Sequence, residues 1–340
     1  MNTPMSSLEK CPHFPVMMSE VIQTCNPIDG GLFVDCTFGG GSYSKEFLKH
    51  PKTKVIALDR DKKVIEEAKI VKEKNPKKFL FFNEKFSNLD KVIRKENKPN
   101  AIIFDLGLST TQLQDYSRGF SFKSKEKIDM QMGLSFLSAE EVLNTFDEKT
   151  LKLIIKIFGD EQEASKIAKN IIRERKNKRI TNISELVEII KKSKKRNFNK
   201  KINVCTKTFQ ALRIFVNKET TELIEGLIKA TELVKNGGKI IVVSFHSIED
   251  KIVKYYFKNY SLSKSNPSRY LPSTKEKKIS FFEKYRNEFF TPSQEEILKN
   301  PPSRSAKLRY VIRAKDEFVY PKDFKIKFKR YLDLESLNDK

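Results

Sequence analysis

Short apolar runs alternate with amphipathic segments in the first third of the chain. The runs 31–36, 54–59 and 101–106 each have the length of one strand that is buried on both faces. The intervening segment 42–50 and the later segment 62–74 have the pattern of helices. This alternation predicts a mostly parallel sheet with helices on both faces, which is the doubly wound α/β class.

The middle third of the chain has no strand pattern. Over 138–192 the apolar residues recur only at helical spacing. Ser138 and Glu141 have the spacing of a capping box, in which two side chains bond the free backbone N–H groups that begin a helix. Asp147 is expected to cap the next helix. Helices are expected at 148–158, 161–175 and 183–193.

These two patterns divide the chain into two domains, one nested in the other. We expect an all-helical domain at 113–207, inserted into a discontinuous α/β domain that comprises 1–112 and 208–340.

The α/β pattern resumes after the insertion. One long amphipathic helix is expected over 208–235, followed by a strand at 239–245. Residues 306–314 alternate like a final strand. Residues 259–303 are rich in Ser, Pro, Lys and Asn, so they are expected to form a long loop.

The composition adds a strong positive charge to this picture. The 340 residues include 67 Lys and Arg against 44 Asp and Glu, a formal net charge of +23. Most of the basic residues are Lys, as an AT-rich genome produces whatever the function, so the charge by itself only favours a polyanionic partner. Nucleic acid is the first candidate and a membrane surface the second. The basic run 191–201 is either a solvated loop or a loop that contacts phosphate.

No part of the sequence is typical of a membrane-spanning or secreted protein. It has no apolar run near the length of a membrane span and no signal-peptide pattern at its N-terminus, so we expect a cytoplasmic protein with no membrane partner. The four cysteines include no C-x-x-C pair, and the three histidines are scattered. We therefore expect no metal site and reduced thiols.

A glycine cluster follows the first strand. Gly39, Gly40 and Gly41 would let the backbone approach a ligand closely, and Asp59 lies 20 residues after Gly39 at the end of the next strand. At that spacing a carboxylate can bond the ribose hydroxyls of an adenosyl cofactor. Ser44 stands where a dinucleotide loop would have its third glycine, which favours S-adenosylmethionine. A tight turn without a ligand remains the alternative.

Three strands end in an acidic residue. Asp35, Asp59 and Asp105 would all lie at the carboxyl edge of the sheet, where open α/β sheets bind their ligands. An unpaired carboxylate is costly to bury, so three in succession indicate a site rather than a purely structural edge.

Ten ordered segments then match a known family. They are HFPVMMSEVI (13–22), VDCTFGGGSYS (34–44), ALDRD (57–61), FSNLD (86–90), FDLGLSTTQL (104–113), RGFSF (118–122), IDMQM (128–132), FQALRIFVNKE (209–219), SFHSIED (244–250) and NPPSRSAKLR (300–309). With these segments the chain resembles the bacterial small-subunit rRNA cytosine-N4 methyltransferases.

The resemblance implies a class I S-adenosylmethionine-dependent methyltransferase fold with an inserted helical domain. It implies S-adenosylmethionine as cofactor, 16S rRNA or the small ribosomal subunit as partner, and N4-methylation of a cytidine in the decoding region. The cofactor contacts that it implies are Gly41, Ser42, Tyr43, Asp59, Phe86, Asp105 and Gln112.

The chain departs from the family pattern at a few positions. Ser42 and Tyr43 stand where the family usually has Gly-His, so a ring nitrogen is lost from the loop. Gln131 replaces an Arg. A non-catalytic rRNA-binding assembly factor that keeps the fold is therefore the alternative function. The oligomeric state is left open, a homodimer included.

The catalytic residues are the least determined part of the prediction. Asp105, or a backbone carbonyl beside it, is the nearest acceptor for the amino hydrogens of cytosine. His246 is a second candidate as a proton carrier, with a structural role as the alternative. Methylation at cytosine C5 is less favoured because it needs an activated thiolate, and neither Cys36 nor Cys205 has an activating context.

Four basic residues are candidates for RNA contacts. They are Arg118, Arg304, Lys307 and Arg309. Phe120 and Phe122 beside Arg118 are either stacking surfaces for bases or core residues of the insertion, and the core is the commoner place for Phe.

Overall fold

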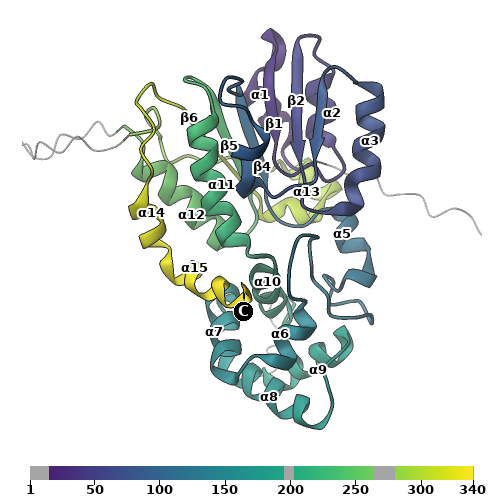
Figure 1. The fold of residues 1–340 in the computed structure, drawn as a ribbon. Helices are drawn as coiled ribbons and strands as arrows, with labels where there is room; N and C mark the ends of the chain where they lie inside the picture. The colour runs from purple at the N-terminus through teal and green to yellow at the C-terminus, as the bar shows by residue number, and fades with distance from the viewer. Residues whose placement is uncertain (1–14, 195–202, 263–279, 340) are drawn as a thin grey trace, which may run out of the picture.

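A six-stranded sheet forms the upper part of the molecule (Figure 1). The computed structural model describes residues 15–194, 203–262 and 280–339. The strand order is β3-β2-β1-β4-β5-β6, and only the β5–β6 pair is antiparallel. The strands are β1 (Gly31–Asp35), β2 (Thr53–Leu58), β3 (Phe79–Phe82), β4 (Ala101–Asp105), β5 (Lys239–Ser244) and β6 (Lys307–Ile312). The predicted doubly wound α/β class is confirmed.

Successive residues of each central strand enter two different cores. Phe33 and Val55 pair across β1 and β2 and lie in the core on one face, whereas Val34 and Ile56 lie in the core on the other. Helices cover both faces because both faces are apolar. On the first face lie α1 (Met18–Cys25), α2 (Ser42–Leu48) and α3 (Ile65–Lys74); on the second lie α4 (Leu89–Val92), α11 (Glu219–Leu233) and α12 (Ser247–Asn259).

The insertion forms a helical lobe below the sheet. It is entered through α5 (Thr110–Gln114), and its helices are α6 (Ala139–Thr145), α7 (Glu148–Gly159), α8 (Ala164–Asn177) and α9 (Ile183–Ser193). The capping box of Ser138 and Glu141 is present, and the Asp147 side chain caps α7. The bounds 113–207 stay a prediction, but α10 (Thr206–Asn217) packs on α7 and so lies with this lobe.

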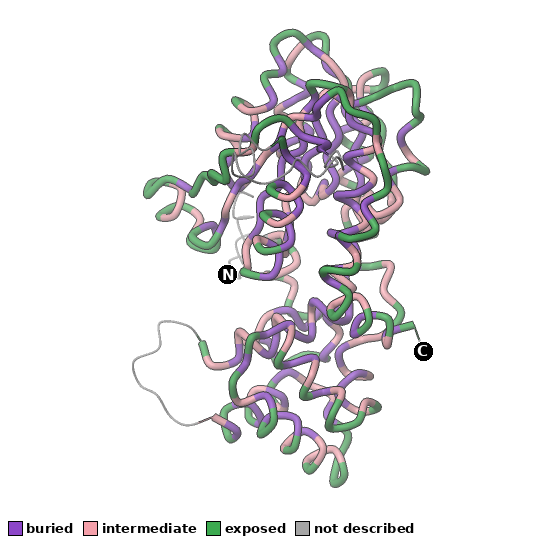
Figure 2. Tube along the Cα trace, turned by 90° about the vertical axis from the view of Figure 1, so that its left-hand side faces the viewer, coloured by how far each residue is buried: buried purple, intermediate pink, exposed green. Residues whose placement is uncertain are grey.

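The two lobes share one hydrophobic core. The core on the α11 face of the sheet continues through α10 into α7 and α8, and Figure 2 shows buried residues in both lobes. The helical lobe is therefore held against the sheet by packing and not only by its two connections. No helix within the described ranges is both long and apolar enough to cross a membrane.

The expected single helix over 208–235 was wrong. The chain leaves α10 at Asn217, adopts a left-handed conformation at Lys218 (φ 50°) and begins α11 at Glu219. The apolar periodicity continues across the break. A left-handed residue is commonly Gly or Asn and not Lys, so the sequence does not indicate a bend at this position.

Other elements were not anticipated at all. The edge strand β3 is only partly buried, and α13 (Gln294–Lys299) lies inside the expected loop 259–303. After β6 come α14 (Lys322–Lys327), α15 (Lys329–Glu335) and a 3₁₀ turn η6 (Ser336–Asp339).

Candidate active site

A pocket of about 440 Å³ lies beyond the carboxyl ends of β1, β2 and β4. The loops that follow these strands form one wall, and the start of α11 forms another. The segment 300–305 and the N-terminal residues Pro15 and Val16 complete it. This is the position in which open α/β sheets hold their ligands, and the volume suits a small molecule.

Asp59 ties the glycine loop to the end of β2. Its Oδ2 accepts a hydrogen bond from the Gly39 N–H (2.8 Å), and its Oδ1 accepts one from the Asp61 N–H (2.8 Å). Burial raises the pKa of the Asp59 carboxyl to about 6, although both hydrogen bonds oppose the shift. The carboxylate therefore holds the loop in shape and also faces the pocket.

Gly41 shapes the loop without lining the pocket. Its φ is 73°, and a Cβ there would lie 2.7 Å from the ring of Phe38. The neighbouring Ser42 and Tyr43 do line the pocket. The Tyr43 ring is buried, and its hydroxyl donates to the Val16 carbonyl oxygen, so the phenol is engaged with the N-terminal segment.

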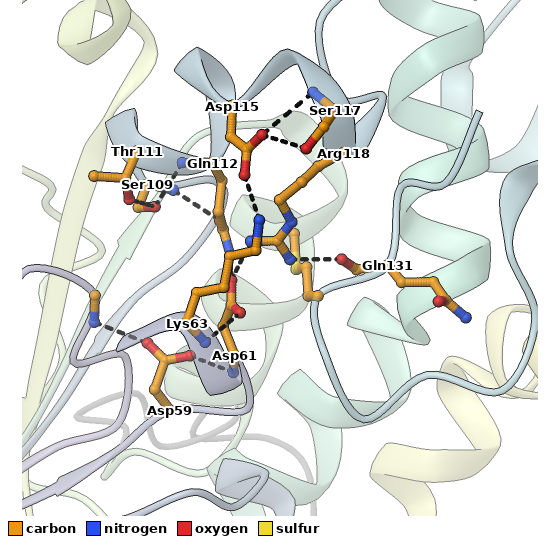
Figure 3. A network of polar contacts seen from close by, with 12 residues as sticks. Asp59, Asp61, Lys63, Ser109, Thr111, Gln112, Asp115, Ser117, Arg118 and Gln131 are labelled. Carbon is orange, nitrogen blue, oxygen red and sulfur yellow. Dashed lines mark hydrogen bonds and ion pairs between the residues drawn. The ribbon is translucent and has the colours of Figure 1, made fainter. Parts of the chain in front are cut away.

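Gln112 belongs to a polar network that joins the pocket to the helical lobe (Figure 3). Its Nε2 donates to Asp61 Oδ2 (2.9 Å), and its Oε1 accepts from the Ser109 N–H (3.0 Å). The same Asp61 forms a buried ion pair with Arg118. Arg118 also donates to the Gln131 carbonyl oxygen (2.7 Å).

This network gives Arg118 a role inside the protein and not at an RNA-binding surface. The side chain is only 8% exposed and is paired, so as it stands the guanidinium is not presented to RNA. Phe120 is buried in the core and Phe122 packs against it, so both rings serve packing rather than stacking on bases. Phe86 lines the pocket and meets Phe104 edge to face, with ring centroids 5.3 Å apart.

Asp105 offers the pocket an unused buried oxygen. Its backbone N–H donates to Thr37 Oγ1 (2.8 Å), but its Oδ1 is buried and has no hydrogen-bond partner among the described residues. Burial raises the pKa of Asp105 well above its ordinary value, and the nearby carboxyls of Asp35 and Glu249 raise it further. A buried acceptor without a partner is suited to a donor or a positive charge on a ligand.

A second group of charged residues also lines the pocket. Arg213 donates to both carboxylate oxygens of Glu219 (2.8 and 2.9 Å), a bidentate pair that spans the break between α10 and α11. Glu249 lies close to this pair. Burial works to raise the pKa of Glu249, but the attraction of His246 and Arg213 outweighs it and lowers the pKa.

His246 is the cap of α12 and is not part of the pocket wall. Its side chain accepts the Glu249 N–H, and its Nε2 lies 3.1 Å from Glu249 Oε1. The Glu219, His246 and Glu249 ligand atoms lie within 4.8 Å of one another, the kind of group that can hold a metal. Arg213 already occupies both oxygens of Glu219, so we propose no metal there, and the absence of a metal site stays a prediction.

The remaining basic candidates lie beside the pocket. Arg304 is exposed, in the same segment as the pocket residues Pro302 and Ser305. Lys307 and Arg309 share Asp250 as a partner (3.3 and 2.8 Å), and Arg309 is almost fully buried. Most of the run 191–201 lies outside the described residues.

Six of the seven predicted cofactor residues therefore line one pocket, and Gly41 supports it from behind. Sequence reasoning missed Asp61, Arg213, Glu219 and Glu249. All four lie inside the motifs ALDRD, FQALRIFVNKE and SFHSIED, so the motifs were the only signal that could have drawn attention to them.

Comparison with known proteins decides the family. Residues 10–314 match the family model described as the MraW methylase family. The chain belongs to this family. It is 41% identical over 304 residues to "Ribosomal RNA small subunit methyltransferase H" of Ehrlichia canis, covering 88% of this chain and 99% of the relative. It is 39% identical over 306 residues to the protein of that name from Orientia tsutsugamushi, covering 88% and 98%.

A solved structure of an rRNA methylase from Streptococcus thermophilus also aligns with 87% of this chain and 95% of that chain, at 10% identity and a TM-score of 0.41. The predicted family and the prediction of a methyltransferase are confirmed by the family match and the curated relatives.

Proposed function

We propose that this MraW-family methylase transfers a methyl group from S-adenosylmethionine to N4 of a cytidine in the decoding region of 16S rRNA, in the small ribosomal subunit. The cytoplasm is where such a substrate would be met. The names of the relatives support the small-subunit rRNA as substrate. The choice of N4 rests on the resemblance in sequence together with the chemistry of the pocket.

The residues present fit the cofactor. Asp59 offers a carboxylate to ribose hydroxyls, and the half-buried ring of Phe86 lies along the same pocket. Asp105 Oδ1, with which no described residue pairs, suits a pocket that must accept a positive charge or an amino donor. When bound, S-adenosylmethionine supplies a methyl group that is already activated on a positively charged sulfur.

Asp105 is the residue that we propose as acceptor for the amino group. Its Oδ1 can accept a hydrogen bond from N4, which draws the nitrogen lone pair out of the ring and raises its nucleophilicity. When the methyl group of a bound cofactor is transferred to N4, the surplus proton of N4 would pass to this oxygen. In its ionised form Asp105 is a stronger base than an ordinary carboxylate, because burial raises its pKa.

The single observation that carries the proposal is this carboxyl oxygen, which has no hydrogen-bond partner among the described residues, in the pocket of a methylase-family chain. It argues against a non-catalytic assembly factor, which has no use for such a costly group. Burial raises the pKa of the Cys36 thiol well above its usual value and also raises that of Cys205, which disfavours C5 methylation through a thiolate.

The experiment is transfer of labelled methyl groups to small ribosomal subunits that lack the modification, followed by nucleoside analysis. We expect label in N4-methylcytidine. Label in 5-methylcytidine, or no label while the cofactor binds, would reject the proposal.

A substitution tests the acceptor. Asp105→Asn keeps the shape but donates where the carboxylate accepted, so kcat should fall by about 100-fold or more, a much larger change than that in the cofactor Kd. His246→Gln should lower kcat much less, since His246 lies outside the pocket wall. Equal decreases in the two variants would count against Asp105 as the acceptor.

A further inference from the structure

The C-terminal residues lie beyond the part of the chain that matches the family, which ends at residue 314. Within them, α15 and η6 pack beside α10, α11 and α7, where the two lobes meet (Figure 1). We call residues 329–339 the tail. Besides covering apolar surface, the tail makes side-chain hydrogen bonds to backbone groups of α10 and α11.

The tail caps both helix ends at the break between α10 and α11. Glu335 is fully buried, and its carboxylate accepts the N–H groups of Thr220 (3.0 Å) and Thr221 (2.8 Å) at the start of α11. Asn338 Nδ2 donates to the carbonyl oxygens of Phe215 (2.9 Å) and Val216 (3.0 Å) at the end of α10. These are the backbone groups that a helix leaves without partners at its ends.

The other side of the same break faces the pocket. Glu219, the residue before Thr220, forms the bidentate pair with Arg213, and both side chains line the pocket. Arg60 of the pocket wall donates to the Asn217 carbonyl oxygen (2.8 Å). Asn217 Oδ1 in turn accepts the Met132 N–H (2.8 Å) of the helical lobe.

We propose that the tail is a positioning element for methyl transfer: through Glu335 and Asn338 it fixes the bend at Lys218 and thereby the Arg213–Glu219 pair in the pocket. This inference rests on the function proposed above. The pair lies next to Glu249, whose carboxyl is close enough to influence Asp105, so a shift of the bend would reach the reacting side of the pocket.

The tail can act in this way because its hydrogen-bond partners are buried. Water could take the place of Glu335 and Asn338 only if the core opened. Removing the Glu335 carboxylate leaves two N–H groups at the start of α11 without their acceptor. The helix end then relaxes by fraying or by a change at Lys218, and Glu219 moves with it. A misplacement of about 1 Å in a catalytic pocket can cost about 100-fold in rate.

The test compares three variants in the full-length protein. Glu335→Ala should lower kcat on small subunits by about tenfold and change the cofactor Kd by less than about threefold. Glu335→Gln keeps an acceptor oxygen and should recover most of kcat. Asp333→Asn removes the same charge from an exposed site on the same helix and should match the wild type. If Glu335→Ala does not fold, Asn338→Ala takes its place.

A double-mutant cycle separates positioning from a general loss of stability. If the tail acts through Glu219, then Glu335→Ala should lower kcat little further in a Glu219→Gln background. The inference would be overturned if the two substitutions lowered kcat independently, so that their effects added in the double variant. It would also be overturned if Glu335→Ala had the wild-type kcat when normalised to the number of cofactor-binding sites.

Hydrogen exchange gives a readout that does not need activity. In Glu335→Ala the amides of 213–222 and of the loop 130–135 should exchange faster than in the wild type, and in Asp333→Asn they should not. Acceleration confined to Thr220 and Thr221 would reject the positioning role. If the wild type transfers no methyl group to small subunits, the proposed function fails, and this measurement still decides whether the tail holds the pocket.

Discussion

At the scale of single residues, Asp59 has two tasks that a substitution can separate from RNA binding. It holds the Gly39 N–H and faces the space that we assign to the cofactor. Asp59→Ala should raise the cofactor Kd by about 10- to 100-fold, since a hydrogen bond to a charged group contributes about 1.5–3 kcal/mol. Calorimetry measures this, and RNA affinity should stay within about twofold in a filter-binding assay.

The matched control for this variant is Glu66→Ala, which removes an exposed carboxylate from the nearby α3. It should leave the cofactor Kd unchanged. An unaltered Kd in Asp59→Ala itself would take Asp59 out of the cofactor site.

The raised pKa of Asp59 also predicts a pH dependence. Before the cofactor binds, the pKa is about 6, above the ordinary 3.8, so the folded chain holds more protons than the unfolded one between about pH 4 and 6. The contribution of Asp59 to stability therefore falls as the pH rises through that window. We expect the pH dependence of cofactor binding to have the opposite sign, because ribose hydroxyls would donate to the ionised carboxylate.

We therefore expect the cofactor Kd to rise about tenfold for each pH unit below about 6. Titration calorimetry between about pH 5 and 7.5 measures it. The Asp59→Asn variant should show a much flatter profile over the same range. A profile of equal steepness in the variant would assign the titration to another group, such as Asp105.

At the scale of elements, the buried pair of Arg118 and Asp61 joins the loop after β2 to the entrance of the helical lobe. Arg118→Ala leaves the Asp61 charge buried without its partner and should lower the free energy of unfolding by about 3–5 kcal/mol. Lys69→Ala, which breaks an exposed pair with Glu66, should cost less than about 1 kcal/mol. Urea unfolding measures both, and equally small effects would show that the pair does not hold the lobe.

The elements that could be predicted from the sequence are those with a local signal. The strands β1, β2, β4 and β5 are uninterrupted apolar runs, and α6 begins at a capping box that is visible directly in Ser138 and Glu141. The break at Lys218 could not be predicted, because it is held by Glu335 and Asn338, more than a hundred residues away along the chain. A periodicity in the sequence relates only residues that are close along the chain.

The same limit applies to the site. Asp59 and Asp105 end strands, and topology alone places them at one edge. Asp61 and the Arg213–Glu219 pair acquire their roles from contacts between loops and helices that only the folded chain brings together. Arg118 was an RNA candidate because an arginine beside aromatic residues suits bases, but in the fold its charge is paired with Asp61.

At the scale of the whole molecule, the net charge is +23, and we expect it to act on RNA mainly where it lies beside the pocket. The segment 300–309 lines the pocket through Pro302 and Ser305, and it also carries the exposed Arg304 and the partly exposed Lys307. An RNA strand that delivers a base to the pocket would pass these side chains. Arg304 and Lys307 would then neutralise its phosphates and release the counterions condensed on the RNA, whereas the distant lysines would not.

The double variant Arg304→Gln, Lys307→Gln should therefore weaken RNA binding and flatten its salt dependence. The slope of log K against log salt should fall by about 0.7 for each phosphate of single-stranded RNA that the variant no longer neutralises. The control Lys74→Gln, Lys77→Gln removes the same charge from exposed positions near β3. Because net charge falls equally in both, equal slopes in the two variants would mean that the protein attracts RNA through its overall charge and not through the segment beside the pocket.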